Sequence, residues 1–366
     1  MNKKKLFFLS LSLFVTFSFV AQLEELTPHE IAYRDSISAL NLKNEATAQS
    51  QEHYNKGIQM FGEKNYKGAI EQFEKSISLD PRFTAVYYNK SVTENEAGNF
   101  IEAATTLDKL ISIDPDYSKA YFQRARALQG SNDYLKAEKD YDKSIQLDPK
   151  NPKAYYNYGT LKFLEIEYLE AIKYFTKAIE LDPNFAFAYN DRGSCHRMMA
   201  NYPKAILDYE EAVKKNPKLA FVLNNIGTTK KKMKDYIGAM AAFNKAISID
   251  PNYATAYNNR GVSQLEQGKK EDAKKDFEKA LQLNPKYAAA SDNLSAIYFK
   301  QRDYKIAFDF ANNAITFDPK YASAYVNRGI AKEMLRDMEG ACNDWHKAEE
   351  LGAGLGKKYH SENCNN

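Results

Sequence analysis

The chain has 366 residues, with 51 Lys and Arg against 48 Asp and Glu. Three of the basic residues, Lys3, Lys4 and Lys5, open the chain, so the remaining residues carry 48 charges of each sign, 51 less those three. This balance gives no indication of nucleic-acid binding, which would need a strongly basic face. The three cysteines have no metal-ligand spacing and are too few for a fold built on disulfides.

The N-terminus has the order of an export signal. Three lysines precede the apolar run 6–20, and Ala21 is a plausible cleavage site, so we assign residues 1–21 to a signal peptide. The run of about 15 residues is shorter than the roughly 20 that span a bilayer. Phe19 stands where a small residue is usual, so an uncleaved membrane anchor is the alternative. We expect an exported protein in the bacterial periplasm or outside the cell, free or associated with the envelope.

Residues 22–49 precede the repeating part of the chain. Thr27-Pro28-His29-Glu30 fits a capping box with Pro at the first helical position. Tyr33, Ile37 and Leu40 follow on one helical face. Both a leader helix that covers the first repeat and a partly disordered linker are compatible with this segment.

From residue 50 the sequence repeats with a period of 34. A proline preceded by Asp or Asn recurs at 81, 115, 149, 183, 217, 251, 285 and 319. A fixed period of this length indicates a repeat array. We place nine repeats in residues 50–352, starting at 50, 84, 118, 152, 186, 220, 254, 288 and 322, and expect residues 353–366 to be a polar tail.

Each repeat contains two runs of roughly 13 residues at helical period. Two antiparallel helices joined by a short turn approach to about 8–10 Å. Small residues such as Gly261 and Ala273 are therefore expected where they cross, with rings such as Tyr257 and Phe277 around them. Proline ends the pair, because it pushes the preceding residue out of the helical region.

This unit resembles the tetratricopeptide repeat, a 34-residue helix–turn–helix. The small and large positions of that family are met in Tyr257-Asn258-Asn259-Arg260-Gly261, Ala273, Phe277, Ala280 and Pro285. The resemblance extends over residues 50–352. It implies an all-α fold, a right-handed superhelical α-solenoid in which the first helices of the repeats line a concave groove.

Repeat eight departs from the pattern. Ser291 and Ala311 stand where rings are expected, and Phe308 or Phe310 is the candidate for compensation. Because solenoid stability is a sum of neighbour interfaces, we expect the junctions of repeat eight to be the weakest.

The residues that often carry chemistry form no catalytic constellation. The five histidines, at 29, 53, 196, 346 and 360, have no partners at metal or triad spacing, and the Gly-rich run 352–356 follows a helix rather than a strand. We expect Cys195 and Cys342 to be small buried hydrophobes and Cys364 to be a free thiol. The sequence thus predicts no enzyme, no cofactor and no metal site.

The remaining candidate site is the groove that the resemblance implies. Positions 2, 5, 9 and 12 of each repeat face it in the family, and here they are aromatic with some cations in the N-terminal half and more polar later. The flanking asparagines can bond the main chain of a bound peptide in the family; alternatively they bond neighbouring helices. The candidate binding residues are Tyr54, Tyr88, Asn89, Phe122, Arg126, Tyr156, Asn157, Phe163, Asn190, Arg197, Asn224, Asn225, Asn258 and Asn259.

We therefore expect a non-catalytic scaffold that binds a peptide segment or a partner protein in the groove. The alternative is a structural subunit of a bacterial envelope assembly that acts through its convex face or its C-terminal end. No nucleic acid is expected as a partner, and membrane contact only if the signal segment is uncleaved.

Overall fold

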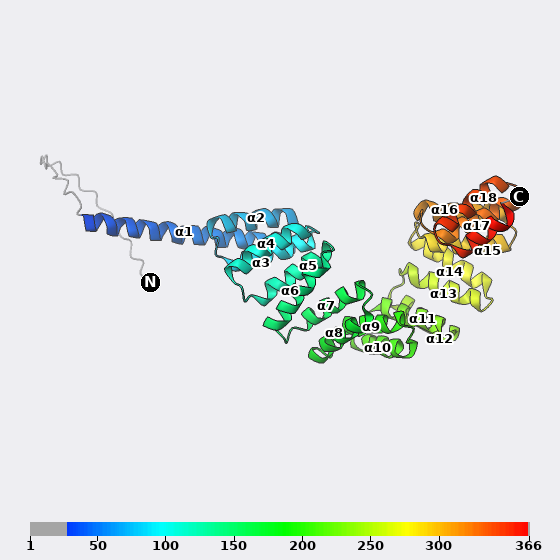
Figure 1. The fold of residues 1–366 in the computed structure, drawn as a ribbon, viewed down its shortest axis with the longest axis horizontal. Helices are drawn as coiled ribbons and strands as arrows, with labels where there is room; N and C mark the ends of the chain where they lie inside the picture. The colour runs from blue at the N-terminus through cyan, green and yellow to red at the C-terminus, as the bar shows by residue number, and fades with distance from the viewer. Residues whose placement is uncertain (1–27, 365–366) are drawn as a thin grey trace, which may run out of the picture. The chain divides into compact units, whose positions relative to one another are not determined.

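The computed structural model describes residues 28–364. The predicted signal peptide, residues 1–21, lies outside these residues. The described part of the chain is helical throughout, from α1 to α19, and has no strand (Figure 1). Between residues 28 and 364 no helix is both long and apolar enough to cross a membrane.

The chain divides between Ala97 and Gly98 into two compact bodies. The N-terminal body contains α1 (Pro28–Gly62), α2 (Tyr66–Leu79) and α3 (Thr84–Glu96). The C-terminal body contains α4 (Phe100–Ile113), α5 (Ser118–Gly130), α6 (Tyr134–Leu147), α7 (Pro152–Leu164), α8 (Tyr168–Leu181), α9 (Ala186–Met198), α10 (Tyr202–Lys215), α11 (Ala220–Lys232), α12 (Tyr236–Ile249), α13 (Ala254–Glu266), α14 (Lys270–Leu283), α15 (Ala288–Lys300), α16 (Tyr304–Phe317), α17 (Ala322–Met334), α18 (Met338–Glu350) and α19 (Gly354–Asn363).

In the N-terminal body the leader and the first helix of repeat one form one helix. No Pro or Gly interrupts residues 29–56, so α1 continues for 35 residues. Its C-terminal part packs on α2, where Tyr54 contacts Phe73 and Phe83. The leader does not cover the first repeat, because its apolar residues are exposed, 66 % for Tyr33 and 53 % for Leu40.

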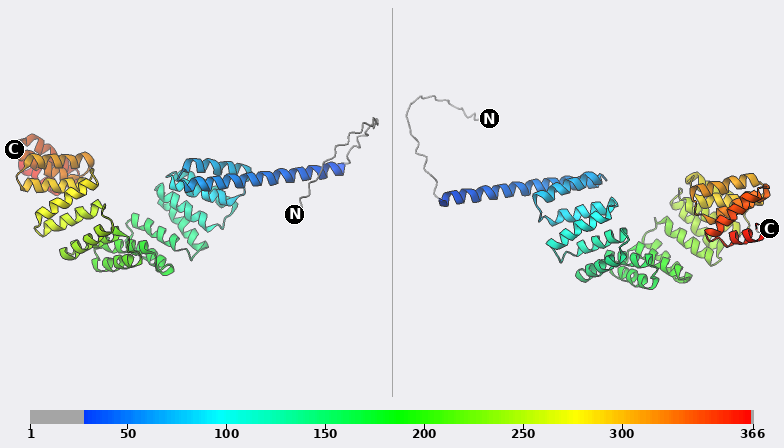
Figure 2. Two further views of the ribbon diagram at one scale, coloured as in Figure 1. Left: turned by 180° about the vertical axis from the view of Figure 1, so that it is seen from behind. Right: turned by 45° about the horizontal axis from the view of Figure 1, so that its top comes forward.

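In the C-terminal body the helices follow one another as stacked pairs, α5 with α6 through α17 with α18 (Figure 2). The first helix of each pair begins at the first residue of a predicted repeat, from Ser118 to Ala322. These tandem pairs confirm the prediction of an all-α solenoid of helix–turn–helix repeats.

The Asp-Pro step turns the chain from one repeat to the next. Asp250, the residue after α12, has an extended backbone (φ −127°, ψ 93°), as the following proline requires. Its Oδ1 accepts the N–H of Asn252 at 2.9 Å, and its carbonyl accepts the N–H of Tyr253 at 3.2 Å. This Asx turn leads directly into α13.

The two helices of a pair meet where the small residues were predicted. A Cβ added to Gly261 of α13 would lie 2.7 Å from Cε1 of Phe277, a ring of α14 that is fully buried. Repeat eight solves the crossing differently, with Ser295 donating its hydroxyl to the carbonyl of Ala307. There Phe310 stacks on Tyr298 at 5.4 Å, as the compensating ring, and the expectation of weak junctions stays a prediction.

An arginine clasp joins the repeats at every second step, with a period of 68 residues. Arg260 of α13 donates Nε and Nη2 to Asp276 of α14 at 2.7 and 2.6 Å, and Nη1 to Asn244 of α12 at 2.7 Å. The same clasp is made by Arg124, Arg192 and Arg328. Each clasp ties both helices of its own repeat to the second helix of the preceding one.

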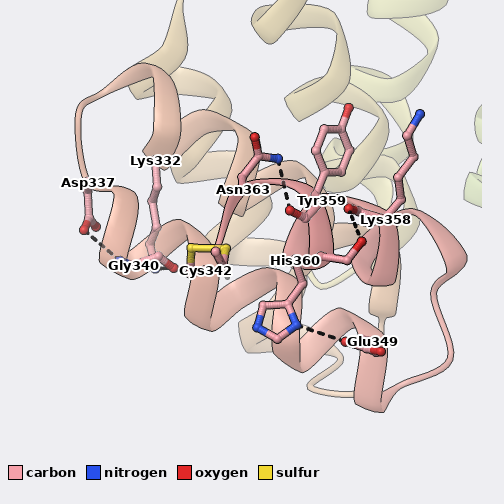
Figure 3. The surroundings of a disulfide bond; sticks show 11 residues. Lys332, Asp337, Gly340, Cys342, Glu349, Lys358, Tyr359, His360 and Asn363 are labelled. Carbon is pink, nitrogen blue, oxygen red and sulfur yellow. Dashed lines mark hydrogen bonds and ion pairs between the residues drawn. A yellow bond between two sulfur atoms is a disulfide. The ribbon is translucent and has the colours of Figure 1, made fainter. Parts of the chain in front are cut away.

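The C-terminal segment differs from the predicted polar tail. Residues 354–363 form α19, which packs on α18 and stacks Tyr359 on the indole of Trp345 at 5.2 Å. Cys364 is not a free thiol and Cys342 is not an unpaired hydrophobe, because the two form a disulfide with their Cα atoms 5.7 Å apart (Figure 3). Cys195 is buried and unpaired, as expected, and burial raises the pKa of its thiol to about 12.

Candidate functional site

Side chains of consecutive first helices meet in a ladder of hydrogen bonds. Asn225 of α11 donates its amide to Asn190 of α9 at 3.0 Å, and Asn259 of α13 donates to Asn224 of α11 at 2.9 Å. The ladder continues from Asn293 to Asn258, and from Asn327 to Asp292. The series begins on α7, where the Tyr156 hydroxyl donates to Asp191 of α9 at 2.7 Å. Each of these hydrogen bonds links two residues that are 35 positions apart. We call this row of hydrogen bonds the polar ladder.

The polar ladder accounts for five of the predicted asparagines. Asn190, Asn224 and Asn258 are buried and accept from the following helix, whereas Asn225 and Asn259 donate. This geometry corresponds to the alternative in which these amides bond neighbouring helices. Asn89, in the N-terminal body, likewise donates to the Tyr54 hydroxyl at 3.0 Å.

Asn157 and its neighbour in the preceding repeat break the pattern. The amide of Asn157 donates within its own helix, to the Lys153 carbonyl at 2.8 Å. The residue 35 positions earlier is Phe122, which has no polar group to offer.

Several of the predicted aromatic residues belong to the core. Phe122 is 9 % exposed and lies against the Tyr141 ring at 6.3 Å. Tyr156 packs between Phe175 and Phe185, at 5.7 and 4.7 Å, and burial raises the pKa of its hydroxyl. These rings hold helices together rather than offering an open surface.

The other predicted residues lie on partly exposed faces of the first helices. Tyr88 is half-buried on α3, in the N-terminal body. On α5, Arg126 donates to Gln123 at 3.1 Å. Phe163 and Arg197 remain, and the structure brings these two residues together.

Phe163 and Arg197 line a hollow between α7, α8 and α9. Its volume is about 270 Å³, and we call it the α7–α9 hollow. Its lining consists of Thr160, Phe163, Leu164, Phe175, Asp191, Ser194 and Arg197. Phe163 supplies a ring and Leu164 an aliphatic side chain, whereas the Phe175 ring is fully buried, and Asp191 and Arg197 add one group of each charge. The hollow can therefore take an apolar group with a polar neighbour.

The charged groups of the hollow are held in place by hydrogen bonds. Asp191 accepts from the Tyr156 hydroxyl and from Asn190, and burial raises the pKa of its carboxyl. Arg197 donates Nε to the Tyr209 hydroxyl at 3.3 Å. Asp191 was not among the residues predicted from the sequence. It occupies the position at which the neighbouring repeats have Asn, and this difference could have marked it as a candidate site residue.

One exposed ring, Phe187, lies on a stripe of α9 that also reaches the hollow. Phe187, Asn190, Ser194 and Arg197 follow at helical spacing on one face. The Phe187 ring is 44 % exposed and stacks on Phe221 of α11 at 6.1 Å. The stripe and the α7–α9 hollow together offer apolar contact area and fixed polar groups on one side of α9.

A second exposed feature runs along the second helices of the repeats. The second residue of α4, α6, α8 and α12 is a large aliphatic, between 63 and 82 % exposed. This aliphatic row consists of Ile101, Leu135, Leu169 and Ile237. The same position carries Glu271, Lys305 and Glu339 in α14, α16 and α18, so the row ends before the last three repeats.

One group of side chains has the composition of a metal site, although the sequence predicts none. His346, Glu349 and His360 bring their ligand atoms within 4.8 Å of one another at the C-terminal end. Sequence spacing could not reveal this group, because His346 and His360 belong to helices that meet only when α19 folds back on α18.

Comparison with known proteins identifies the repeats. Models described as "Tetratricopeptide repeat" match residues 84–117, 118–151, 152–185, 174–206 and 254–287, and one described as "TPR repeat" matches residues 230–268. No curated protein gave a significant match to the sequence.

Solved structures share the fold at low sequence identity. The Pseudomonas aeruginosa PilF structure is 22 % identical, with a TM-score of 0.51 over 58 % of this chain and 97 % of PilF. A tetratricopeptide repeat protein from Parabacteroides merdae is 19 % identical, with a TM-score of 0.55 over 67 % and 97 %. A chain of the Cut9–Hcn1 hetero-tetramer of the APC/C is 15 % identical, with a TM-score of 0.56 over 91 % and 82 %.

Proposed function

Because the chain contains tetratricopeptide repeats, which are typical of protein–protein interaction scaffolds, we propose that it binds a protein or peptide segment on its first helices. The observation that carries the proposal is the α7–α9 hollow, with the exposed Phe187 ring on the same helix beside it. Ligand-binding pockets in proteins typically combine apolar walls with a few polar groups in fixed positions. An apolar side chain of the partner would enter the hollow, and its neighbours would lie along Phe187.

The site is suited to binding because little of it must be ordered. Tyr156 and Asn190 hold the Asp191 carboxylate, and Tyr209 holds the Arg197 guanidinium, before any partner arrives. Side chains that are already placed lose less entropy on binding. Asp191 and Arg197 would select a partner whose apolar anchor is followed by polar or charged groups.

The test compares two surface variants of the chain without residues 1–21. Phe187→Ala with Arg197→Ala removes the exposed ring and the cation of the hollow, whereas Ile237→Ala removes an aliphatic side chain elsewhere that is 82 % exposed. Truncating a hot spot costs about 2 kcal/mol or more, which is roughly 30-fold in affinity. We expect a partner captured from detergent-solubilised envelope, and confirmed with purified components, to lose at least this affinity with the double variant alone.

Variants in Phe122 or Tyr156 would be a poor test of the same idea. Both rings pack in the core, so their removal would damage the repeat as well as the site. Equal affinity of the wild type and the Phe187→Ala/Arg197→Ala variant would refute the proposed site.

The aliphatic row favours the alternative of a structural subunit that acts through its second helices. Exposed aliphatics recur at the same position of four helices, interrupted only by Pro203 in α10, and a partner could cover them. Under this alternative, Leu135→Gln with Ile237→Gln would abolish capture and the α9 variant would leave it intact. The two outcomes are opposite, so one set of binding measurements separates the two functions.

We also propose that the protein works in an oxidising compartment outside the cytoplasm. The export-signal pattern of residues 1–21 supports this location, and so does the pairing of Cys342 with Cys364, since cytosolic thiols are kept reduced. The test is alkylation of intact cells before reduction, followed by mass analysis of the Cys364 peptide. Alkylated Cys364 in growing cells would contradict the proposed location.

A further inference from the structure

The C-terminal end of the solenoid contains two matched layers of side chains between α18 and α19. Cys342 and His346 are four positions apart on α18, and His360 stands four positions before Cys364, the residue that follows α19. Residues at this spacing lie one above the other on a helix. The disulfide joins the cysteines in one layer, and the two imidazole rings approach to 4.9 Å in the next.

A carboxylate completes the histidine layer. Nδ1 of His360 lies 3.1 Å from Oε2 of Glu349, and Figure 3 shows His360 directed at Glu349 beside the disulfide. One ligand atom from each of His346, Glu349 and His360 lies within 4.8 Å of the others. Glu350 is also near, with Oε1 3.5 Å from Nε2 of His346.

We propose that His346, Glu349 and His360 bind one zinc ion. Two imidazole nitrogens and a carboxylate oxygen are a donor set that suits Zn²⁺, with a fourth position for water or for Glu350. At bond lengths of about 2.0–2.1 Å, tetrahedral ligand atoms lie roughly 3.3–3.5 Å apart. The ligand atoms must therefore approach by at most about 1.5 Å to bind the ion.

A purely structural role explains only part of the arrangement. The bond between His360 and Glu349 would help to hold α19 without any ion. It does not require His346, which is exposed and lies 3.5 Å from Glu350 of its own helix, and among the described residues no hydrogen bond joins the two imidazole rings. Zinc uses both rings at once.

The ion would fasten α19 to α18 independently of the disulfide. His346 and Glu349 belong to α18 and His360 to α19, so coordination joins the same two helices as the disulfide, one turn away. Both bonds keep Tyr359 over Trp345 and close the open end of the repeat array. Terminal repeats need such a cover because they have a neighbour on one side only.

The test uses the oxidised chain without residues 1–21, purified with a tag that contains no histidine and stripped of metal with a chelator. Zn²⁺ is titrated by calorimetry, and Co²⁺ serves as a probe through its visible absorption. We expect one ion per chain, and at least a tenfold loss of affinity in His346→Ala and in His360→Ala. His53→Ala, which removes a histidine of the N-terminal body that is hydrogen-bonded to Gln72, is the matched control.

Glu349→Gln separates coordination from packing. Its amide oxygen still accepts a hydrogen bond from His360, so a structural contact would survive, while the carboxylate ligand is lost. We expect zinc affinity to fall at least tenfold with the fold unchanged. Absence of saturable zinc binding by the parent chain, or an affinity in all three cluster variants equal to that of the parent, would overturn the proposal.

Hydrogen exchange gives a second measurement that does not depend on affinity. In a Cys342→Ser/Cys364→Ser chain α19 is held without the disulfide, so zinc should slow exchange of its amides if it bridges the two helices. The same chain with His360→Ala should show no response to zinc. Equal exchange of α19 with and without zinc in the Cys342→Ser/Cys364→Ser chain would also overturn the proposal.

Discussion

Gly329→Ala tests whether the helix crossing of the last repeat admits only a hydrogen side chain. A Cβ at Gly329 of α17 would lie 2.4 Å from Nε1 and 2.6 Å from Cδ1 of Trp345, so the indole would have to move by about 1 Å to reach an ordinary 3.4 Å contact. Trp345 is fully buried and stacked on Tyr359, which leaves it no open space. Its buried N–H has no hydrogen-bond partner, so the effect is steric.

The magnitude follows from two opposing contributions. Overpacking a core costs about 1–3 kcal/mol, and Ala recovers up to about 1 kcal/mol of helix propensity relative to Gly. We therefore expect the last repeat to lose about 1 kcal/mol of stability, and up to about 2 kcal/mol if the surrounding helices do not relax.

Trp345 makes this loss measurable, because it is the only tryptophan of the chain. Its fluorescence during urea titration follows the last repeat itself, which matters because long repeat arrays do not always unfold as one unit. The control is Gly354→Ala in α19, where no atom lies within 4 Å of the new Cβ. A Gly329→Ala variant as stable as the parent, with unchanged emission, would refute the steric account.

Three further changes probe the clasp, the disulfide and a buried carboxyl. Asp276→Asn leaves the Arg260 guanidinium without its charged partner, so α13 and α14 should lose about 1.5–3 kcal/mol; unchanged amide exchange in these helices would contradict the role of the clasp. Cys364→Ser opens a loop of 22 residues. Loop entropy puts its contribution at about 3 kcal/mol, seen as lost protection of α19, and retained protection would show that packing alone holds the helix. Burial raises the pKa of the Asp292 carboxyl, so its contribution to stability is full below the unfolded pKa and is lost as pH rises through the folded value. As pH rises from about 4 to neutrality, the melting temperature of Asp292→Asn should therefore fall less than that of the parent. Melting temperatures that change in parallel with pH would contradict this sign.

The candidate site shows how far sequence reasoning extends. The repeat period placed Asn190, at position 5 of its repeat, and Asn225, at position 6 of the next repeat, on first helices. It could not decide whether their side chains bond a ligand or a neighbouring helix. That choice depends on how closely adjacent first helices lie, and at 3.0 Å the two amides bond each other. Phe122 was expected on the open face for the same reason, and its burial against Tyr141 depends on the packing angle between helices.

The sequence by itself determined the repeat period, the helix pairs and the crossings. Those features arise within 34 residues, from the helical period of apolar residues, from the sterics of Asp-Pro steps and from small residues opposite rings. Only the tertiary structure decided that α19 folds back on α18, and with it the pairing of Cys342 with Cys364 and the meeting of His346 with His360. These contacts depend on the direction in which the chain turns after Gly352, and no periodicity encodes that direction because the repeat has ended.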